Sequence, residues 1–311
     1  GTDALNLCLH GLLKEGDHVV TSDLEHNSVL RPLRSLILEK QIGVAYARSD
    51  DAGVVSPESV RARLQPHTRL VVLTHASNVT GVVQPVEQIA EIARQRGAKT
   101  LVDAAQTAGH LPLNVNDLKC DLLAAPGHKG LLGPTGTGFL YVSDLVQHDL
   151  IPVRQGGTGT HSEWDEQPDE MPFRFESGNL NVPGLVGLQQ GLEYLESRGV
   201  DAVAQQIARC TEHLRTRLRD VPGLRIYGSQ ERPTIGVTSL NLDGQDPQEL
   251  ATLLDQVASV QTRAGFHCAA AMHRELKTTD LGGTLRLSCG VMNSIEQIDV
   301  AVDTLRQFAN I

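Results

Sequence analysis

The chain has 311 residues, of which 40% are hydrophobic and 21% are charged, which is typical of a globular protein long enough for two well-buried cores. Its net charge of −10 at pH 7 disfavours nucleic acid or an anionic membrane as a partner, because both attract basic surfaces. No apolar run approaches the roughly 20 residues that a bilayer-crossing helix needs.

Helix and strand patterns alternate along the first half of the chain. Helices are predicted over residues 2–13, 27–38, 57–64 and 86–96. Strands are predicted over residues 17–20, 43–47, 70–74, 100–103, 122–125 and 136–142. Strands separated by helices of this length indicate an α/β fold, in which a mostly parallel sheet carries helices on both faces.

The second half of the chain follows a loop rich in Gly, Thr, Glu and Asp over residues 155–172. Helices are predicted over residues 185–198, 203–219, 247–256 and 295–308, and strands over residues 235–240, 261–266 and 285–289. This alternation is typical of a compact α+β domain. We therefore predict a large domain over residues 1–178, followed over residues 179–311 by connecting helices and a smaller C-terminal α+β domain.

The five cysteines are too widely scattered for a disulfide framework, and no Cys or His spacing is typical of a metal site. We therefore expect a cytoplasmic protein with reduced thiols and no bound metal. Cysteines of this kind are mostly small buried apolar residues. They are Cys8, Cys120, Cys210, Cys268 and Cys289.

A lysine in a tight turn is the first feature that indicates chemistry. Lys129 lies in the segment Ala-Ala-Pro-Gly-His-Lys-Gly-Leu-Leu-Gly-Pro (124–134), directly after a predicted strand. Loops at strand ends carry the chemistry of many α/β proteins. A lysine screened by apolar neighbours can lose its proton and act as a nucleophile or form a Schiff base. A solvated surface lysine is the alternative, but Lys129 alone among the six lysines has apolar and Gly neighbours on both sides.

A carboxylate closes another predicted strand 26 residues before Lys129, where Asp103 ends the apolar segment Leu-Val-Asp. Pyridoxal 5′-phosphate (PLP) is an electron sink while its pyridine nitrogen is protonated, and a carboxylate against that nitrogen keeps the proton there. Asp103 suits this role, and Gln106 is close enough in sequence to reach the ring hydroxyl. A strand-end Asp alone more often caps a helix. Together with a strand-end lysine, it predicts a PLP site.

Four motifs carry a resemblance to a known family: Asp-Ala-Ala-Gln (103–106), Gly-His-Lys (127–129), Arg-Ala-Gly-Phe-His-Cys (263–268) and Gly-Thr-Leu-Arg-Leu-Ser (283–288). In this order they resemble the class V aminotransferases, and within them the group II cysteine desulfurases and selenocysteine lyases. The resemblance runs from residues 1–6 to the C-terminal helix. It implies the PLP-dependent transferase fold type I and PLP as the cofactor. It also implies that an N-terminal segment of the large domain is missing, so that the chain is truncated.

The resemblance assigns several residues to the cofactor. Lys129 would bind PLP covalently, and the adjacent His128 would also lie at the cofactor. Thr2 opens the first helix, where exposed N–H groups attract the phosphate, although it could simply cap that helix. His26 would lie flat against the PLP ring and relay a proton, whereas a histidine after a strand is more often a cap or a surface group. Asn78 would contact the ring hydroxyl and the substrate.

Two further residues define the expected reaction. At the position of Cys268, the family has a cysteine that attacks the sulfur of the substrate and becomes a persulfide. A reactive thiolate needs cationic or donor groups nearby, which Arg263 and His267 supply in sequence; an inert buried cysteine is the alternative. Arg286 fits a bidentate clamp on the substrate α-carboxylate, with an exposed structural arginine as the alternative. The short stretch between Cys268 and Arg286 implies a restrained cysteine loop.

The sequence departs from the family pattern at two positions. Pro126 stands where the family commonly has a hydroxyl residue that binds the phosphate, and proline offers neither a hydroxyl nor an N–H group. Asn179 replaces a threonine that reaches the phosphate of the neighbouring subunit, although an amide can still donate a hydrogen bond. Both departures predict a cofactor that is held more loosely than is usual in the family.

These residues together predict a PLP-dependent cysteine desulfurase that converts L-cysteine to L-alanine and keeps the sulfur as an enzyme persulfide. The resemblance implies a homodimer that passes sulfur to a separate acceptor protein and serves iron–sulfur cluster assembly. A selenocysteine or cysteine-sulfinate lyase, which would not need the Cys268 nucleophile, is one alternative. A catalytically impaired relative that acts as a binding subunit is another.

Overall fold

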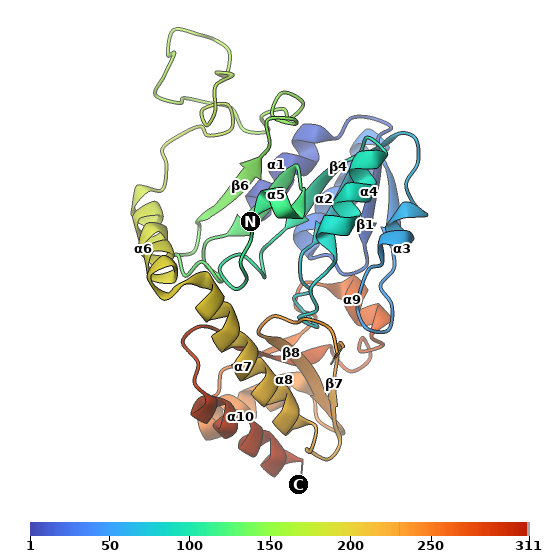
Figure 1. The fold of residues 1–311 in the computed structure, drawn as a ribbon, viewed down its shortest axis with the longest axis vertical. Coiled ribbons are helices and arrows are strands. Elements are labelled where there is room, and N and C mark those ends of the chain that lie inside the picture. The colour runs from blue at the N-terminus through green and yellow to red at the C-terminus, as the bar shows by residue number, and fades with distance from the viewer. Residues whose placement is uncertain (230, 310–311) are drawn as a thin grey trace.

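The structure is a computed structural model that describes residues 1–229 and 231–309, and its strands form two sheets (Figure 1). The larger sheet has the order β2-β1-β3-β4-β5-β6. Its strands are β1 (His18–Ser22), β2 (Gly43–Ala47), β3 (Thr68–Thr74), β4 (Lys99–Asp103), β5 (Leu122–Pro126) and β6 (Gly138–Val142). Only the pairing of β5 with β6 is antiparallel in this sheet. The predicted mostly parallel, mixed sheet is therefore confirmed.

Helices cover both faces of this sheet. Alternate strand residues point to opposite faces, and apolar side chains on both faces need to be buried. Val19 and Val72 pack in one cluster with the first two helices, whereas Val20 and Val71 pack in a second cluster with Ile89. The helices of this half are α1 (Thr2–Leu12), α2 (Asn27–Lys40), α3 (Pro57–Arg61), α4 (Val86–Gln95) and α5 (Val115–Leu118). Fully apolar strands with helices on both sides are the expected result for a parallel sheet.

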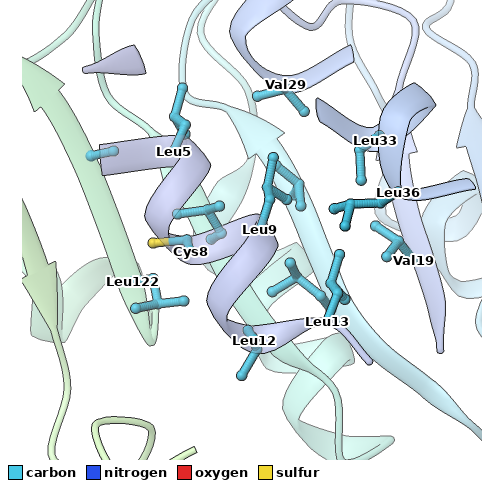
Figure 2. Packing of buried hydrophobic residues seen from close by; sticks show 14 of the residues in the cluster. Leu5, Cys8, Leu9, Leu12, Leu13, Val19, Val29, Leu33, Leu36 and Leu122 are labelled. Atoms are coloured by element: carbon cyan, nitrogen blue, oxygen red, sulfur yellow. The ribbon is translucent and has the colours of Figure 1, made fainter. Parts of the chain in front are cut away.

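Helix α1 shows how the sequence pattern produces this packing. Leu5, Cys8, Leu9 and Leu12 are buried and recur at the spacing of one helical face. Figure 2 shows this face packed against Val29, Leu33 and Leu36 of α2 and against strand residues such as Val19 and Leu122. The packing fixes the N-terminus of α1 beside the end of β5, where the ideal Cβ position of Gly1 is 3.2 Å from Pro126 Cδ.

The second half of the chain forms a smaller, fully antiparallel sheet with the order β7-β8-β10-β9. Helices α6 (Val182–Arg198) and α7 (Val200–Leu218) lead into it (Figure 1). The other elements are β7 (Leu224–Ile226), β8 (Val237–Leu242), α8 (Pro247–Ala258), β9 (Arg263–Gly265), α9 (Ala270–Glu275), β10 (Thr284–Ser288) and α10 (Ile295–Phe308). This arrangement agrees with the predicted C-terminal α+β unit, while the domain boundary at residue 178 stays a prediction.

The structure differs from the predicted elements where backbone geometry ends them early. The strand predicted over residues 261–266 is shortened at both ends to β9, and beyond its last residue the chain turns through His267 and Cys268, whose φ angles are 49° and 60°. Left-handed residues cannot continue a strand. The predicted elements also missed α5, α9 and the three-residue strand β7, which are too short to show a clear apolar period.

A long connection without helix or strand joins β6 to α6. It spans residues 143–181 and contains the predicted loop of residues 155–172. In Figure 1 this segment extends away from the large sheet. Across the two described stretches of chain, no helix is both long and apolar enough to cross a membrane.

Candidate active site

Four of the predicted site residues lie where parallel strands of the large sheet end. Asp103 is the last residue of β4, and Lys129 follows β5. His26 follows β1, and Asn78 follows β3. Because parallel strands end at the same edge of a sheet, the fold brings these side chains together. The strand register agrees, since Asp103 pairs with Thr74 of β3 and with Ala124 of β5.

The turn that carries Lys129 is closely packed. An ideal Cβ on Gly127 would lie 2.1 Å from Thr137 Oγ1, so glycine is required there for the backbone to approach β6. The Gly127 N–H donates to the carbonyl of Thr137 at 2.8 Å, and the Leu132 N–H donates to the carbonyl of Lys129 at 2.9 Å. These contacts hold the lysine in a defined position beyond the end of β5.

Burial lowers the pKa of Lys129, while the carboxylate of Asp103 opposes this shift. The charges of Arg286, Cys268 and Arg263 also act on the lysine. Asp103 itself is buried, and its Oδ1 accepts a hydrogen bond from the Ala105 N–H at 2.9 Å. A lysine beside a buried carboxylate, with a pKa below its ordinary value, is suited to covalent and proton-transfer chemistry.

His26 is the N-terminal cap of α2. The histidine therefore does act as a helix cap, at the sheet edge where Asp103 and Lys129 also lie. Its Nδ1 accepts a hydrogen bond from the Ser28 N–H at 3.0 Å and lies 2.9 Å from Ser28 Oγ. Ser28 Oγ lies 2.8 Å from Thr2 Oγ1. Burial lowers the pKa of His26, while Asp103 opposes the shift. Sequence reasoning missed Ser28, whose signal was its place two residues after a candidate cap.

The cysteine loop is held from the large-domain side. The Asn78 side-chain Nδ2 donates to the carbonyl of His267 at 2.6 Å, and the Asn27 N–H donates to the carbonyl of Cys268 at 2.8 Å. The imidazole Nε2 of His267 lies 2.9 Å from Thr284 Oγ1 and 3.1 Å from the Thr284 carbonyl. The carbonyls of His267 and Cys268 thus both accept hydrogen bonds from the large-sheet half of the chain, which agrees with the expected restrained loop.

Two arginines of the small sheet lie beside this loop. Arg286 on β10 pairs directly with Arg263 on β9, so their side chains share one face of the sheet. Arg263 Nη2 lies 4.0 Å from Cys268 Sγ, and Arg286 Nη1 donates to the Asn78 carbonyl at 3.0 Å. Among the described residues, no acceptor partners the buried Arg286 Nε. A buried guanidinium edge without an acceptor is a site where a carboxylate can bind.

Three predicted residues make fewer contacts. Gln106 is half-buried, and its carbonyl lies 3.1 Å from His110 Nδ1. His128 is largely exposed, and the slight burial of its ring together with the charge of Lys129 lowers its pKa. Asn179 is exposed on the connection between β6 and α6.

The other four cysteines are buried, and the described residues include no arranged group of metal ligands. Cys8, Cys120, Cys210 and Cys289 are buried and free, whereas Cys268 is half-buried. Burial raises the pKa of Cys120 to about 11 and of Cys289 to about 12. Within residues 1–229 and 231–309, no group of three or more His, Cys, Asp or Glu side chains is arranged to hold a metal ion.

Comparisons with known proteins agree with this geometry. Residues 1–300 match the Aminotransferase class-V family. The chain is 37% identical to a probable cysteine desulfurase from Methanothermobacter thermautotrophicus, over 99% of this chain and 77% of the relative. It is similar in structure to an apo cysteine desulfurase from Thermococcus onnurineus, with a TM-score of 0.92, 32% identity, and coverage of 99% of this chain and 77% of that one.

A second solved structure, the cysteine desulfurase CsdA (S-sulfonic acid) from Escherichia coli, has a TM-score of 0.90 and 26% identity. The alignment covers 99% of this chain and 77% of that chain. The predicted resemblance is therefore confirmed along the whole chain. This chain belongs to the class V aminotransferase family.

Proposed function

We propose that this protein is a PLP-dependent cysteine desulfurase that converts L-cysteine to L-alanine and keeps the sulfur as a persulfide on Cys268. The observation that carries the proposal is the meeting of Lys129 and Asp103 from one sheet with Cys268 and Arg286 from the other. The names of the similar proteins support the same reaction.

The residues present fit PLP. Lys129 is a half-buried amine with a lowered pKa, and Asp103 is a buried carboxylate that acts on it and would hold the proton on the pyridine nitrogen. Gly1 and Thr2 open α1 next to Pro126, where helix N–H groups would hold the phosphate even though proline supplies no donor. Asn78, Gln106 and His128 are the other groups proposed to line the cofactor. When bound, PLP withdraws electrons from the α-carbon of the substrate.

Arg286 has a specific edge available for the substrate carboxylate. Its Nη1 donates to the Asn78 carbonyl, and its Nε has no partner within residues 1–229 and 231–309. The Nε and Nη2 edge of a guanidinium presents two parallel N–H groups, which match the two oxygens of a carboxylate. Arg286 would therefore fix the amino acid by its carboxylate, so that the α-carbon faces Lys129. The lysine, with a pKa lowered by burial, would then take the α-proton.

Cys268 would perform the sulfur transfer. Its thiolate attacks the substrate sulfur, so that an S–S bond forms while the Cβ–S bond breaks. The electron pair of the broken bond stays with the carbon fragment, which takes up a proton at Cβ, regains the α-proton and leaves as alanine. The guanidinium of Arg263 lies 4.0 Å from the sulfur, where it can donate a hydrogen bond to it. The two backbone hydrogen bonds on the loop hold the sulfur at the site.

We also propose that the protein assembles as a homodimer. Asn179 and its neighbours Leu180 and Val182 are exposed, and Val186 extends this apolar surface onto α6. We expect a second copy of the chain to cover it and to receive Asn179 at its phosphate. Light scattering on the wild type and on Val186→Asp tests this, and a wild-type monomer would contradict it.

The five free thiols suit a cytoplasmic protein. We propose that it passes sulfur to an acceptor protein for iron–sulfur cluster assembly.

Product analysis tests the proposed reaction. PLP-loaded protein given L-cysteine and a thiol reductant should release alanine and sulfide in equal amounts. Cys268→Ala should lose this activity, whereas the buried-cysteine control Cys210→Ala should retain it. If Cys268→Ala released alanine at the wild-type rate, the persulfide step would be excluded. Strong turnover of selenocysteine or cysteine sulfinate by the same variant would instead identify a lyase.

A further inference from the structure

The contacts of Ser28 determine which nitrogen of His26 carries the proton. A backbone amide can only donate, so the Ser28 N–H at 3.0 Å requires a lone pair on His26 Nδ1. A neutral imidazole has one protonated nitrogen and one with a lone pair. The proton of the neutral ring therefore has to be on Nε2.

The His26 ring is also held neutral by its surroundings. Burial lowers its pKa, and the cations Lys129, Arg263 and Arg31 act in the same direction, while Asp103 opposes them. A helix N-terminus disfavours a nearby cation, and His26 caps α2. The amide contact and the surrounding charges thus both favour a neutral ring with a free Nδ1 lone pair.

The Ser28 hydroxyl joins this histidine to the N-terminus of α1. Its oxygen lies 2.9 Å from His26 Nδ1 and 2.8 Å from Thr2 Oγ1. Thr2 is the residue proposed at the cofactor phosphate, and His26 is the residue proposed against the cofactor ring. Ser28 therefore connects two parts of one binding site, although its own side chain belongs to neither role.

We infer that Ser28 is a positioning residue that fixes His26 as the Nε2–H tautomer, so that Nε2 is the atom that delivers a proton at the active site. The destination of that proton rests on the proposed function, but the tautomer does not. Ser28 acts through His26: its backbone amide selects the tautomer and its hydroxyl holds the ring orientation relative to Thr2.

Nitrogen NMR tests the tautomer directly on protein without cofactor. In two-bond ¹H–¹⁵N spectra of protein labelled at histidine nitrogens, His26 is assigned by the signal that His26→Gln lacks. We expect a protonated Nε2 and an unprotonated Nδ1. A protonated Nδ1 in the wild type would overturn the inference, whatever the protein proves to catalyse.

Two substitutions separate the amide from the hydroxyl. Ser28→Ala keeps the N–H group and should keep the Nε2–H tautomer, while Ser35→Ala on the same helix is its control. Ser28→Pro removes both groups in the first turn of a helix, where proline is tolerated, and should give a mixture of tautomers. A folded Ser28→Pro protein with only the Nε2–H form would contradict the role of Ser28. If that variant does not fold, the wild-type spectrum still decides the tautomer.

The inference also predicts a kinetic difference. A positioned proton donor contributes roughly 10²–10⁴-fold to a rate. In PLP-loaded protein, kcat of Ser28→Pro should fall toward that of His26→Gln, with little change in KM, whereas Ser28→Ala should lose less. Failure of all variants, wild type included, to turn over cysteine would refute the proposed function while leaving the NMR result intact.

Discussion

The two sides of the active site are held in place in different ways. On the large-domain side, Asp103 and Lys129 stand at the ends of neighbouring parallel strands, which form the interior of the fold. On the small-domain side, Cys268 stands in a left-handed turn that is bonded across the interface by Asn78 and by the Asn27 N–H. The first arrangement follows from sheet topology, whereas the second depends on a few hydrogen bonds between residues far apart in sequence.

The largest effect is expected on the large-domain side, at Lys129. Lys129→Ala should lower alanine formation by at least roughly 10³-fold, because it removes both the covalent attachment and the α-proton acceptor. The exposed Lys14→Ala is the control and should retain activity. Alanine release and peptide mapping after borohydride reduction in the presence of PLP measure the effect. Labelling of another lysine would show that the site is assigned incorrectly.

On the small-domain side, Arg286 should affect the substrate and leave the cofactor in place. Arg286→Ala should weaken binding of L-cysteine by about 2–5 kcal/mol, the usual cost of removing one partner of a buried charge pair. Arg286→Lys should recover only part of this, because an ammonium cannot present two parallel N–H groups. Titration of PLP-loaded protein, followed by absorbance, separates the two ligands. Loss of PLP from Arg286→Ala would mean that this arginine serves the cofactor or the fold.

The hydrogen bond from Asn78 to the His267 carbonyl can be removed without changing the size of the side chain. Asn78→Asp keeps one oxygen but loses the amide donor, which leaves the His267 carbonyl unsatisfied at a cost of about 1–3 kcal/mol. The loop should open more often, so that iodoacetamide alkylates Cys268 at least several-fold faster. Asn27→Ala is a matched control, because Asn27 holds the loop through its backbone N–H. Equal alkylation rates in wild type and Asn78→Asp would show that this bond does not restrain the loop.

The smallest effect is expected from the titration of a buried carboxyl group near the end of β3, and it changes the pH dependence of stability. Glu25 is fully buried, and its Oε1 accepts from the Thr74 N–H at 3.1 Å, while its Oε2 has no partner in the part of the chain that the structure describes. Burial raises its pKa from 4.5 to about 8. Between these values the folded state holds a proton that the unfolded state has lost, so stability falls with rising pH by about 1.4 kcal/mol per unit.

Glu25→Gln removes this titration and keeps the shape of the side chain. The free energy of unfolding should therefore fall less steeply between pH 5 and pH 8 in the variant than in the wild type. Urea unfolding across that range measures the difference. Parallel pH profiles would show that Glu25 is ionised in the folded protein, and would contradict a neutral carboxyl beneath the active site.

The comparison of the two sides also explains what could be predicted from the sequence. Apolar segments separated by helices predicted the large sheet, and residues at the ends of those segments, such as Asp103 and Lys129, predicted one side of the site. The motif around Cys268 predicted a reactive residue, although its turn shortened the expected strand. These features are local in sequence, so the pattern of residues contains them.

The contacts that join the two sides could not be predicted in this way. Asn78 bonds to the carbonyl of His267, 189 residues later, through a group that every residue has. The contact of the Ser28 N–H with His26 also uses a backbone donor, which every residue except proline has. Residue types can indicate a cap or a nucleophile, but they do not state which backbone atom a side chain will meet.

The central claim is that Cys268, held by contacts to the large domain, receives the sulfur that Lys129 and Arg286 prepare for transfer. Mass spectrometry of PLP-loaded protein after a single turnover of L-cysteine, without reductant, tests it most directly. We predict that the peptide containing Cys268 gains one sulfur atom, and that the gain is absent in Lys129→Ala. Alanine formation with an unmodified Cys268, or sulfur on another cysteine, would contradict the account.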